Sequence, residues 1–119
     1  MIQKKSLKDA IQNPEIISVV GGLISHPFRQ RSITDSDLNK FINPGWGMVS
    51  GNSFKNIPNG AYAYGVVVLI GSPNSYERMT QLYIPDNNTG IYFRSSYSGS
   101  SGTSQITTEW QKLSFAPII

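Results

Sequence analysis

The sequence contains no cysteine and few charged residues. Lys and Arg number 10 and Asp and Glu number 7, so that charged residues make up 14% of the 119 positions, against about a quarter in ordinary globular domains. Without cysteine the chain forms neither disulfides nor thiolate metal sites. A protein that works outside a cell without disulfides usually gains stability by oligomerisation instead.

Histidine and long apolar runs are also scarce. His26 is the only histidine, which excludes a histidine-rich metal site within one chain. We interpret it as a packed or surface residue beside Pro27, the alternative being a metal bound by three copies on a trimer axis. The longest apolar run, Val66 to Ile70, is too short to cross a bilayer, and the first residues lack a signal-peptide core. We expect a soluble chain made in a cytoplasm, without membrane insertion, metal or cofactor.

The charged residues that are present indicate neither nucleic-acid binding nor catalysis. Basic residues are scattered, with Lys4-Lys5 and Arg29-Gln30-Arg31 the nearest approach to a cluster, so we expect no nucleic-acid partner. Asp35, Asp37 and Asp86 are explained as capping or turn residues. Glu77 and Glu109 remain as a possible acid–base pair, which is too small an inventory to predict an enzyme.

Aromatic, glycine, serine and asparagine residues take the place of charge. Six Tyr, five Phe, two Trp and 11 Gly favour β-sheets joined by tight turns. Carbohydrate-facing proteins share this composition, because flat rings and neutral hydrogen-bonding groups suit sugars. Composition alone does not show whether the aromatic and small polar residues reflect a β-sheet fold or a carbohydrate-binding function.

Residues 1–33 differ from the rest and are interpreted as an N-terminal stem or connector, with 34–119 forming a compact β-domain. A short helix is predicted from Ser6 to Ile11, a strand from Glu15 to Val20, and an irregular connector from Leu23 to Ile33. A capping box at Thr34 to Asp37 precedes Leu38, Phe41 and Ile42, whose spacing predicts one or two helical turns.

The remaining sequence alternates strands with turns. Turns are predicted at Asn59-Gly60, Gly71 to Asn74 and Pro85 to Gly90, and a flexible loop at Ser98 to Ser104. Tyr62 to Ile70 is nearly continuous in apolar residues, which is typical of a central strand buried on both faces. The prediction is a mainly β, small antiparallel, sandwich-like knob with one or two short N-terminal helices; its strands are Trp46–Ser50, Tyr62–Ile70, Tyr76–Ile84, Ile91–Tyr97 and Trp110–Phe115.

The order of short motifs carries a resemblance. A Leu-Asn helix leads into Pro-Gly-Trp, a Pro-Asn-Gly turn and a Gly-Val-Val-Val-Leu strand, and then come Gln-Leu-Tyr, Thr-Gly-Ile-Tyr-Phe-Arg and Trp-Gln-Lys-Leu. These motifs are Leu38-Asn39, Pro44 to Trp46, Pro58 to Gly60, Gly65 to Leu69, Gln81 to Tyr83, Thr89 to Arg94 and Trp110 to Leu113. The series resembles the pyocin-knob domains of bacteriophage tail fibres and R-type pyocin fibres over about residues 34 to 115. Trp46 departs from the Tyr more often found there, and the last segment has one Trp where two are common.

The resemblance implies a non-catalytic knob carried on trimeric fibres. It predicts a tail-fibre domain of a virion, made in the host cytoplasm and acting extracellularly on a bacterial surface polysaccharide such as lipopolysaccharide, capsule or teichoic acid. Its other partners would be further tail-fibre segments and itself, as a homotrimer to which residues 1–33 contribute. Two alternatives stay open: a purely structural fibre spacer, and a free-standing carbohydrate-binding module.

The aromatic residues supply the candidate binding site. Residues two apart in a strand share one face, so Tyr62 pairs with Tyr64 and Tyr92 with Arg94. Rings that stack on sugars, beside groups that bond hydroxyls, would form a shallow saccharide face. We predict Tyr62, Tyr64, Tyr92, Arg94 and Tyr97 as saccharide-binding residues, whereas Trp46 and Trp110 are expected in the core.

Overall fold

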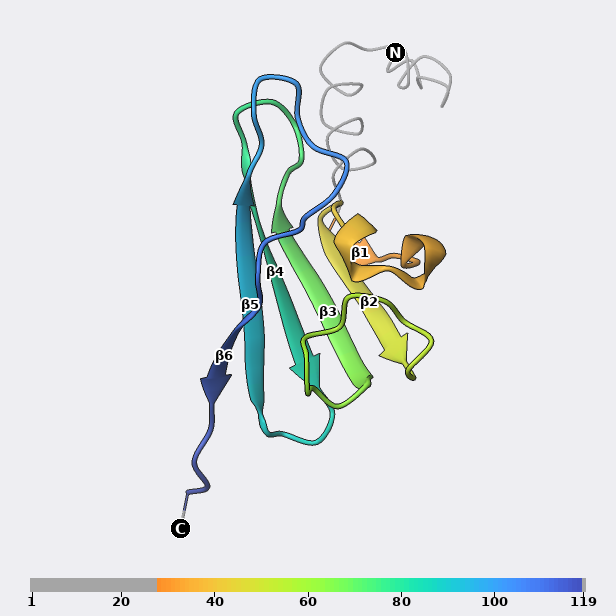
Figure 1. Ribbon diagram of the computed structural model, residues 1–119, viewed down its shortest axis with the longest axis vertical. Coiled ribbons are helices and arrows are strands. Elements are labelled where there is room, and N and C mark those ends of the chain that lie inside the picture. Colours follow the sequence, from red (N-terminus) through yellow and green to blue (C-terminus); the bar gives the residue numbers. More distant parts are fainter. Residues whose placement is uncertain (1–27, 119) are drawn as a thin grey trace, which may run out of the picture.

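A computed structural model describes residues 28–118 as one six-stranded sheet with irregular segments packed on it (Figure 1). The strands follow one another in chain order across the sheet. The first pair is parallel and every later pair is antiparallel. The strands are β1 (Arg29–Gln30), β2 (Gly45–Ser50), β3 (Tyr64–Gly71), β4 (Arg78–Pro85), β5 (Gly90–Tyr97) and β6 (Gln111–Ser114). The predicted mainly β, antiparallel class is confirmed, while the helix and strand expected before residue 21, and His26, lie outside the described residues.

The second layer consists of chain segments and not of a second sheet. Residues 31–44, 51–63 and 98–110 supply the side chains that pack on the face of the sheet formed by Val49, Val67 and Met79. We call this the inner face and the opposite one the outer face. The sandwich-like arrangement is therefore half sheet and half loops, because the links between strands are long enough to fold back over one side.

The core lies between the inner face and these segments. The sheet contributes Val49, Val67, Leu69, Met79, Tyr83 and Tyr92, and the loops contribute Leu38, Phe41 and Ile106. Gly47 allows the close approach, since a Cβ there would come within 3.0 Å of Ile33 and Phe41 side-chain atoms. Burial of these side chains is the main stabilising contribution to the fold.

Two short 3-10 turns replace the predicted helix after residue 33. They are η1 (Thr34–Ser36) and η2 (Leu38–Lys40). The predicted capping box does not form, because Ile33 is the N-cap of η1 and makes no side-chain cap bond. Asp37 instead caps η2, accepting a hydrogen bond from the Asn39 amide at 2.9 Å. The apolar residues after it keep their predicted role, with Leu38 and Phe41 buried.

Strand β3 is central, as predicted, but it is not buried on both faces. Val67 and Leu69 are fully buried on the inner face, while Tyr64 and Ile70 on the outer face are about half exposed, at 47% and 55%. The continuous apolar run predicted that both faces of the strand are buried. Among the described residues, other segments pack on its inner face only.

Three smaller expectations are also corrected. Arg29 and Gln30 lie in a strand paired with β2, in a segment predicted to be irregular. Neither Trp46 nor Trp110 is fully buried; Trp110 packs against the edge of the core. The Ser98–Ser104 loop is tied to the β3–β4 turn, because Thr103 N donates to Pro73 O at 3.0 Å and Ser75 Oγ donates to Ser100 O at 2.6 Å.

Between residues 28 and 118, no helix has the length and apolar character needed to span a membrane.

Candidate functional site

A buried arginine stands at the centre of the polar contacts on the inner face. Arg94 in β5 is 4% exposed, and its neighbour across the sheet, Gln81 in β4, is fully buried. Arg94 Nε donates to Gln81 Oε1 at 2.8 Å, and Gln81 Nε2 donates to the carbonyl oxygens of Leu38 and Phe41 at 2.7 and 3.0 Å. The pair therefore binds the η2 segment to the middle of the sheet.

Arg94 has no carboxylate among its hydrogen-bond partners. Its Nη1 donates to Asn39 Oδ1 at 2.9 Å and to Thr108 O at 3.4 Å, and its Nη2 has no hydrogen-bond partner among the described residues. Burial lowers the pKa of the guanidinium to about 10, and the field of Asp37 acts in the opposite direction. The group remains charged at neutral pH.

Arg94 also fixes the ring of Trp110. The guanidinium carbon lies 4.2 Å from the Trp110 ring centroid, which is a cation–π contact. The indole Nε1 donates to Asn56 O at 3.1 Å. Because the ring is held by both contacts, it is ordered before any ligand arrives, which lowers the entropic cost of stacking on it.

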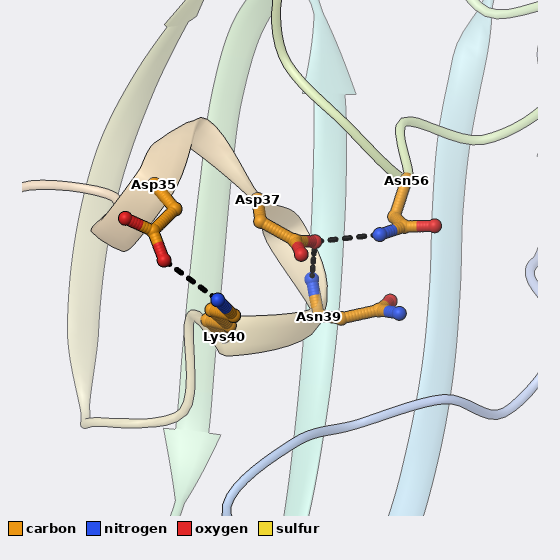
Figure 2. A network of polar contacts seen from close by, with 5 residues as sticks. All are labelled: Asp35, Asp37, Asn39, Lys40 and Asn56. Carbon is orange, nitrogen blue, oxygen red and sulfur yellow. Dashed lines mark hydrogen bonds and ion pairs between the residues drawn. The ribbon is translucent and has the colours of Figure 1, made fainter.

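Asn56, the hydrogen-bond partner of Trp110, belongs to a polar cluster with Asp37 and Asn39 (Figure 2). Asp37 Oδ1 accepts from Asn56 Nδ2 at 2.6 Å and from the Asn39 amide at 2.9 Å. Next to it, Lys40 and Asp35 form an exposed ion pair at 2.6 Å, which lowers the pKa of the Asp35 carboxyl and raises that of Lys40. Asn39, Asp37 and Asn56 thus connect back to both Arg94 and Trp110.

An open hollow of about 680 Å³ lies against Trp110. Tyr92 and Lys112 form one part of its wall; they are cross-strand neighbours in β5 and β6, with Lys112 Nζ 5.5 Å from the Tyr92 ring centroid. The full lining is Pro58, Asn59, Gly60, Tyr92, Glu109, Trp110 and Lys112. We call this hollow the Trp110 cleft. Two aromatic rings beside an amide, an ammonium and a carboxylate are groups suited to stacking on a sugar and bonding its hydroxyls.

The structure does not bring the five predicted saccharide residues onto one face. Tyr92 and Arg94 share a face, as predicted, but it is the inner one and both are buried. Tyr92 lines the Trp110 cleft and Arg94 contacts its tryptophan. Because side chains alternate along β5, Tyr92 and Arg94 point to the inner face and are buried there, away from the exposed tyrosines.

The other three tyrosines are exposed at two ends of the sheet. The rings of Tyr62 and Tyr64 are 5.5 Å apart, near the start of β3. Tyr97 lies on the outer face at the far end of β5, with the Arg78 guanidinium carbon 5.2 Å from its ring centroid. Tyr64 and Tyr97 therefore occupy opposite ends of the outer face, and a common site for all five residues is not formed.

Sequence reasoning missed Asn59, Glu109 and Lys112 as site residues and placed Trp110 in the core. Pairing of Tyr92 with Lys112 is what brings the segment that contains Glu109, Trp110 and Lys112 beside β5. That pairing depends on how β6 aligns with β5 after a connection of more than a dozen residues. Such a register does not follow from a turn type, unlike that of the β4–β5 hairpin.

The two glutamates do not form an acid–base pair. Glu77 lies where the chain enters β4, its carbonyl accepting from the Ser98 amide just after β5, whereas Glu109 lines the cleft beside Tyr92 near the start of β5. The length of a strand separates them. Within residues 28–118 no group of three or more His, Cys, Asp or Glu side chains is placed to hold a metal ion.

Comparisons with family models, with curated proteins and with solved structures gave no match. The ordered motifs of the sequence and the chemistry of the Trp110 cleft are the features of this chain that bear on its function.

Proposed function

We propose that this chain is a non-catalytic tail-fibre domain of a bacteriophage or phage-like particle that binds saccharides of the bacterial surface in the Trp110 cleft. The motif series from Leu38 to Leu113 supports the tail-fibre assignment. The observation that carries the binding role is the Trp110 ring, fixed by Arg94 and Asn56 at the wall of an open hollow.

The cleft suits weak recognition of a sugar residue. A pyranose presents CH groups to the ring of Trp110, while the Asn59 amide and the Lys112 ammonium bond its hydroxyls; Tyr92, which is largely buried, forms part of the wall. The site is open and gives each sugar few contacts, so one copy binds weakly. Several copies on one fibre gain affinity by binding a repeating polysaccharide together.

Tryptophan fluorescence tests the proposal, because the chain contains two Trp residues. In a Trp46→Phe background, Trp110 is the sole reporter. We expect its emission to change on titration with lipopolysaccharide, capsule or teichoic acid from a host strain. Lys112→Met should weaken that binding by about tenfold, the effect of losing roughly one hydrogen bond to a charged group.

Whole-cell binding by the otherwise intact chain locates the site. Trp110→Ala should abolish retention on host cells, and Tyr97→Ala, which alters an exposed ring on the outer face, should leave it unchanged. If Tyr97→Ala abolishes retention and Trp110→Ala does not, the binding site lies with the exposed tyrosines and the proposal that the Trp110 cleft binds saccharide is wrong. Full retention by Trp110→Ala and by Tyr62→Ala, Tyr64→Ala and Tyr97→Ala would contradict saccharide binding altogether.

The outer face of the sheet favours a second candidate, a structural spacer within a longer fibre. A spacer needs surfaces that contact other chains and no ligand site. It would show no fluorescence response to any host polysaccharide while still associating with fibre segments.

A further inference from the structure

The outer face is covered by rows of apolar side chains. Pairing aligns Trp46, Val68, Leu82 and Phe93 in one row across β2, β3, β4 and β5. A second row joins Met48, Val66 and Ile84. Cross-strand neighbours on one face stand about 5 Å apart, so each row is continuous.

Several side chains on this face are exposed to solvent in the described chain, while Trp46, Val68 and Leu82 are partly exposed. Met48 is 60% exposed, Leu113 58% and Phe93 40%. Arg78, at one end, is the only charged side chain that strands β2–β6 place on this face. The hydroxyls of Thr80 and Ser95 lie 2.9 Å apart and form a hydrogen bond with each other. Monomeric proteins rarely expose so continuous an apolar surface.

We propose that the outer face is the surface through which one copy of this chain packs on another. The alternation of apolar residues along these strands is the pattern of an inner face of a β-sandwich, in which two sheets stack about 10 Å apart and interdigitate their side chains. Here the described chain supplies one sheet only, and an identical sheet from another copy completes the second layer.

The size of the face fits this role. Strands spaced about 4.8 Å apart, with about 3.3 Å per residue, give β2–β6 a projected area of roughly 500 Å². The side chains standing on the sheet add to this projected area, and a stable interface takes about 800 Å² from each partner.

The chemistry of the face favours a copy of the chain over a different protein. A foreign partner is selected by charges and hydrogen bonds that only it can match. On this face the one charged group, Arg78, and the polar groups of Tyr64, Tyr97 and Gln111 lie at the rim, and the centre is apolar. Two copies have the same twist and the same apolar rows, so their sheets match without any such pattern. The Trp110 cleft lies on the inner side, so association leaves it open to ligand.

Light scattering of the full chain across a range of concentrations, combined with one substitution, tests the proposal. We expect an oligomer at tens of micromolar. Phe93→Arg should shift the midpoint of dissociation at least a hundredfold upward in concentration, because it places a charge in the middle of a dry interface. Tyr76→Arg is the matched control: it also replaces an exposed aromatic ring by arginine, but in the β3–β4 turn, and should leave the midpoint unchanged.

Thermal unfolding verifies that the Phe93→Arg variant is folded. If that variant does not fold, Ile84→Lys is used in its place. A chain that is monomeric at all concentrations overturns the proposal. So does an oligomer that is unaffected by Phe93→Arg and Ile84→Lys, which would place the contact elsewhere, for example in residues 1–33. Binding of polysaccharide by either variant is measured separately, so the outcome does not depend on the proposed function.

Discussion

At the scale of single residues, Arg94 connects the fold to the candidate site. It contacts the sheet through Gln81, the η2 segment through Asn39, and the cleft through Trp110. A buried cation without an ion pair is costly. In this chain the cost is offset by neutral hydrogen bonds and by the electron-rich face of an indole.

Replacing Arg94 by methionine should therefore destabilise the protein by about 2–3 kcal/mol. The substitution keeps most of the volume but leaves Gln81 Oε1 and Asn39 Oδ1 without their donor. Arg78→Met, at an arginine that stacks on Tyr97 in solvent, should cost less than about 0.5 kcal/mol. Urea unfolding measures both, and equal effects would show that the buried network contributes nothing specific.

Tyr83 gives a pH dependence with a definite sign. It is fully buried, its hydroxyl donates to Tyr62 O, and burial first and Asp86 second raise the pKa of the phenol from 10.0 to about 12. The folded state thus holds the phenolic proton more tightly than the unfolded state. This stability is fully present below pH 10 and is lost between about pH 10 and 12, by roughly 2 kcal/mol.

Chemical denaturation at a series of pH values from 8 to about 12 tests this expectation. Tyr83→Phe removes the titrating group, so the loss of stability on raising the pH should be smaller in that variant. If both proteins lose the same free energy of unfolding over this range, the other alkaline groups account for the effect and Tyr83 does not.

At the scale of elements, the turns are what the sequence predicted best. Asn59-Gly60 forms a turn in which Ala61 N donates to Pro58 O at 3.0 Å. The β4–β5 hairpin lies at the predicted Pro85–Gly90 turn, and β4 places Thr80 and Leu82 on one face and Met79 and Gln81 on the other, as expected. Turn residues act through local backbone geometry, so their signal survives without tertiary information.

Comparing Gly71 with Gly60 separates the cost of a positive φ from the cost of a steric clash between a Cβ and the neighbouring strand. Both have positive φ, at +106° and +79°, but a Cβ on Gly71 would lie 2.1 Å from Arg78 O, whereas Gly60 has open space. Gly60→Ala should therefore cost about 1 kcal/mol from backbone strain alone.

Gly71→Ala should cost more than about 3 kcal/mol, because the β3–β4 ladder must also move apart. Differential scanning calorimetry of both variants measures the difference. Similar melting temperatures would mean that the strand end relaxes without cost.

At the scale of the whole molecule, the structure has two distinct sides. The inner side carries the loops, the buried Arg94 network and the Trp110 cleft, and the outer side is an apolar sheet face. The sequence predicted a homotrimer, whereas two sheets stacked face to face make a pair of copies. The light-scattering experiment on the outer face determines which number of copies forms.

The whole molecule should also lack depolymerase activity. Incubation with lipopolysaccharide, capsule or teichoic acid is expected to release no oligosaccharide, since Glu77 and Glu109 lie a strand length apart. Chromatography of the digest is the measurement. Cleavage that disappears in Glu109→Gln but persists in Glu77→Gln would assign catalysis to the cleft and contradict a purely binding role.

The sequence predicted the β class, the places of strands β2–β6 and most of the turns, because alternation and turn chemistry are local properties. It also predicted that Tyr92 and Arg94 share a face, since both lie two apart in β5. Tyr62 lies just before β3, so the predicted shared strand face of Tyr62 and Tyr64 does not form, although their rings are 5.5 Å apart. The packing of the chain determines which face of the sheet each of these residues occupies. That choice follows from where the long segments 31–44, 51–63 and 98–110 fold back, and it buried Arg94, opened the cleft at Trp110 and left the outer face uncovered.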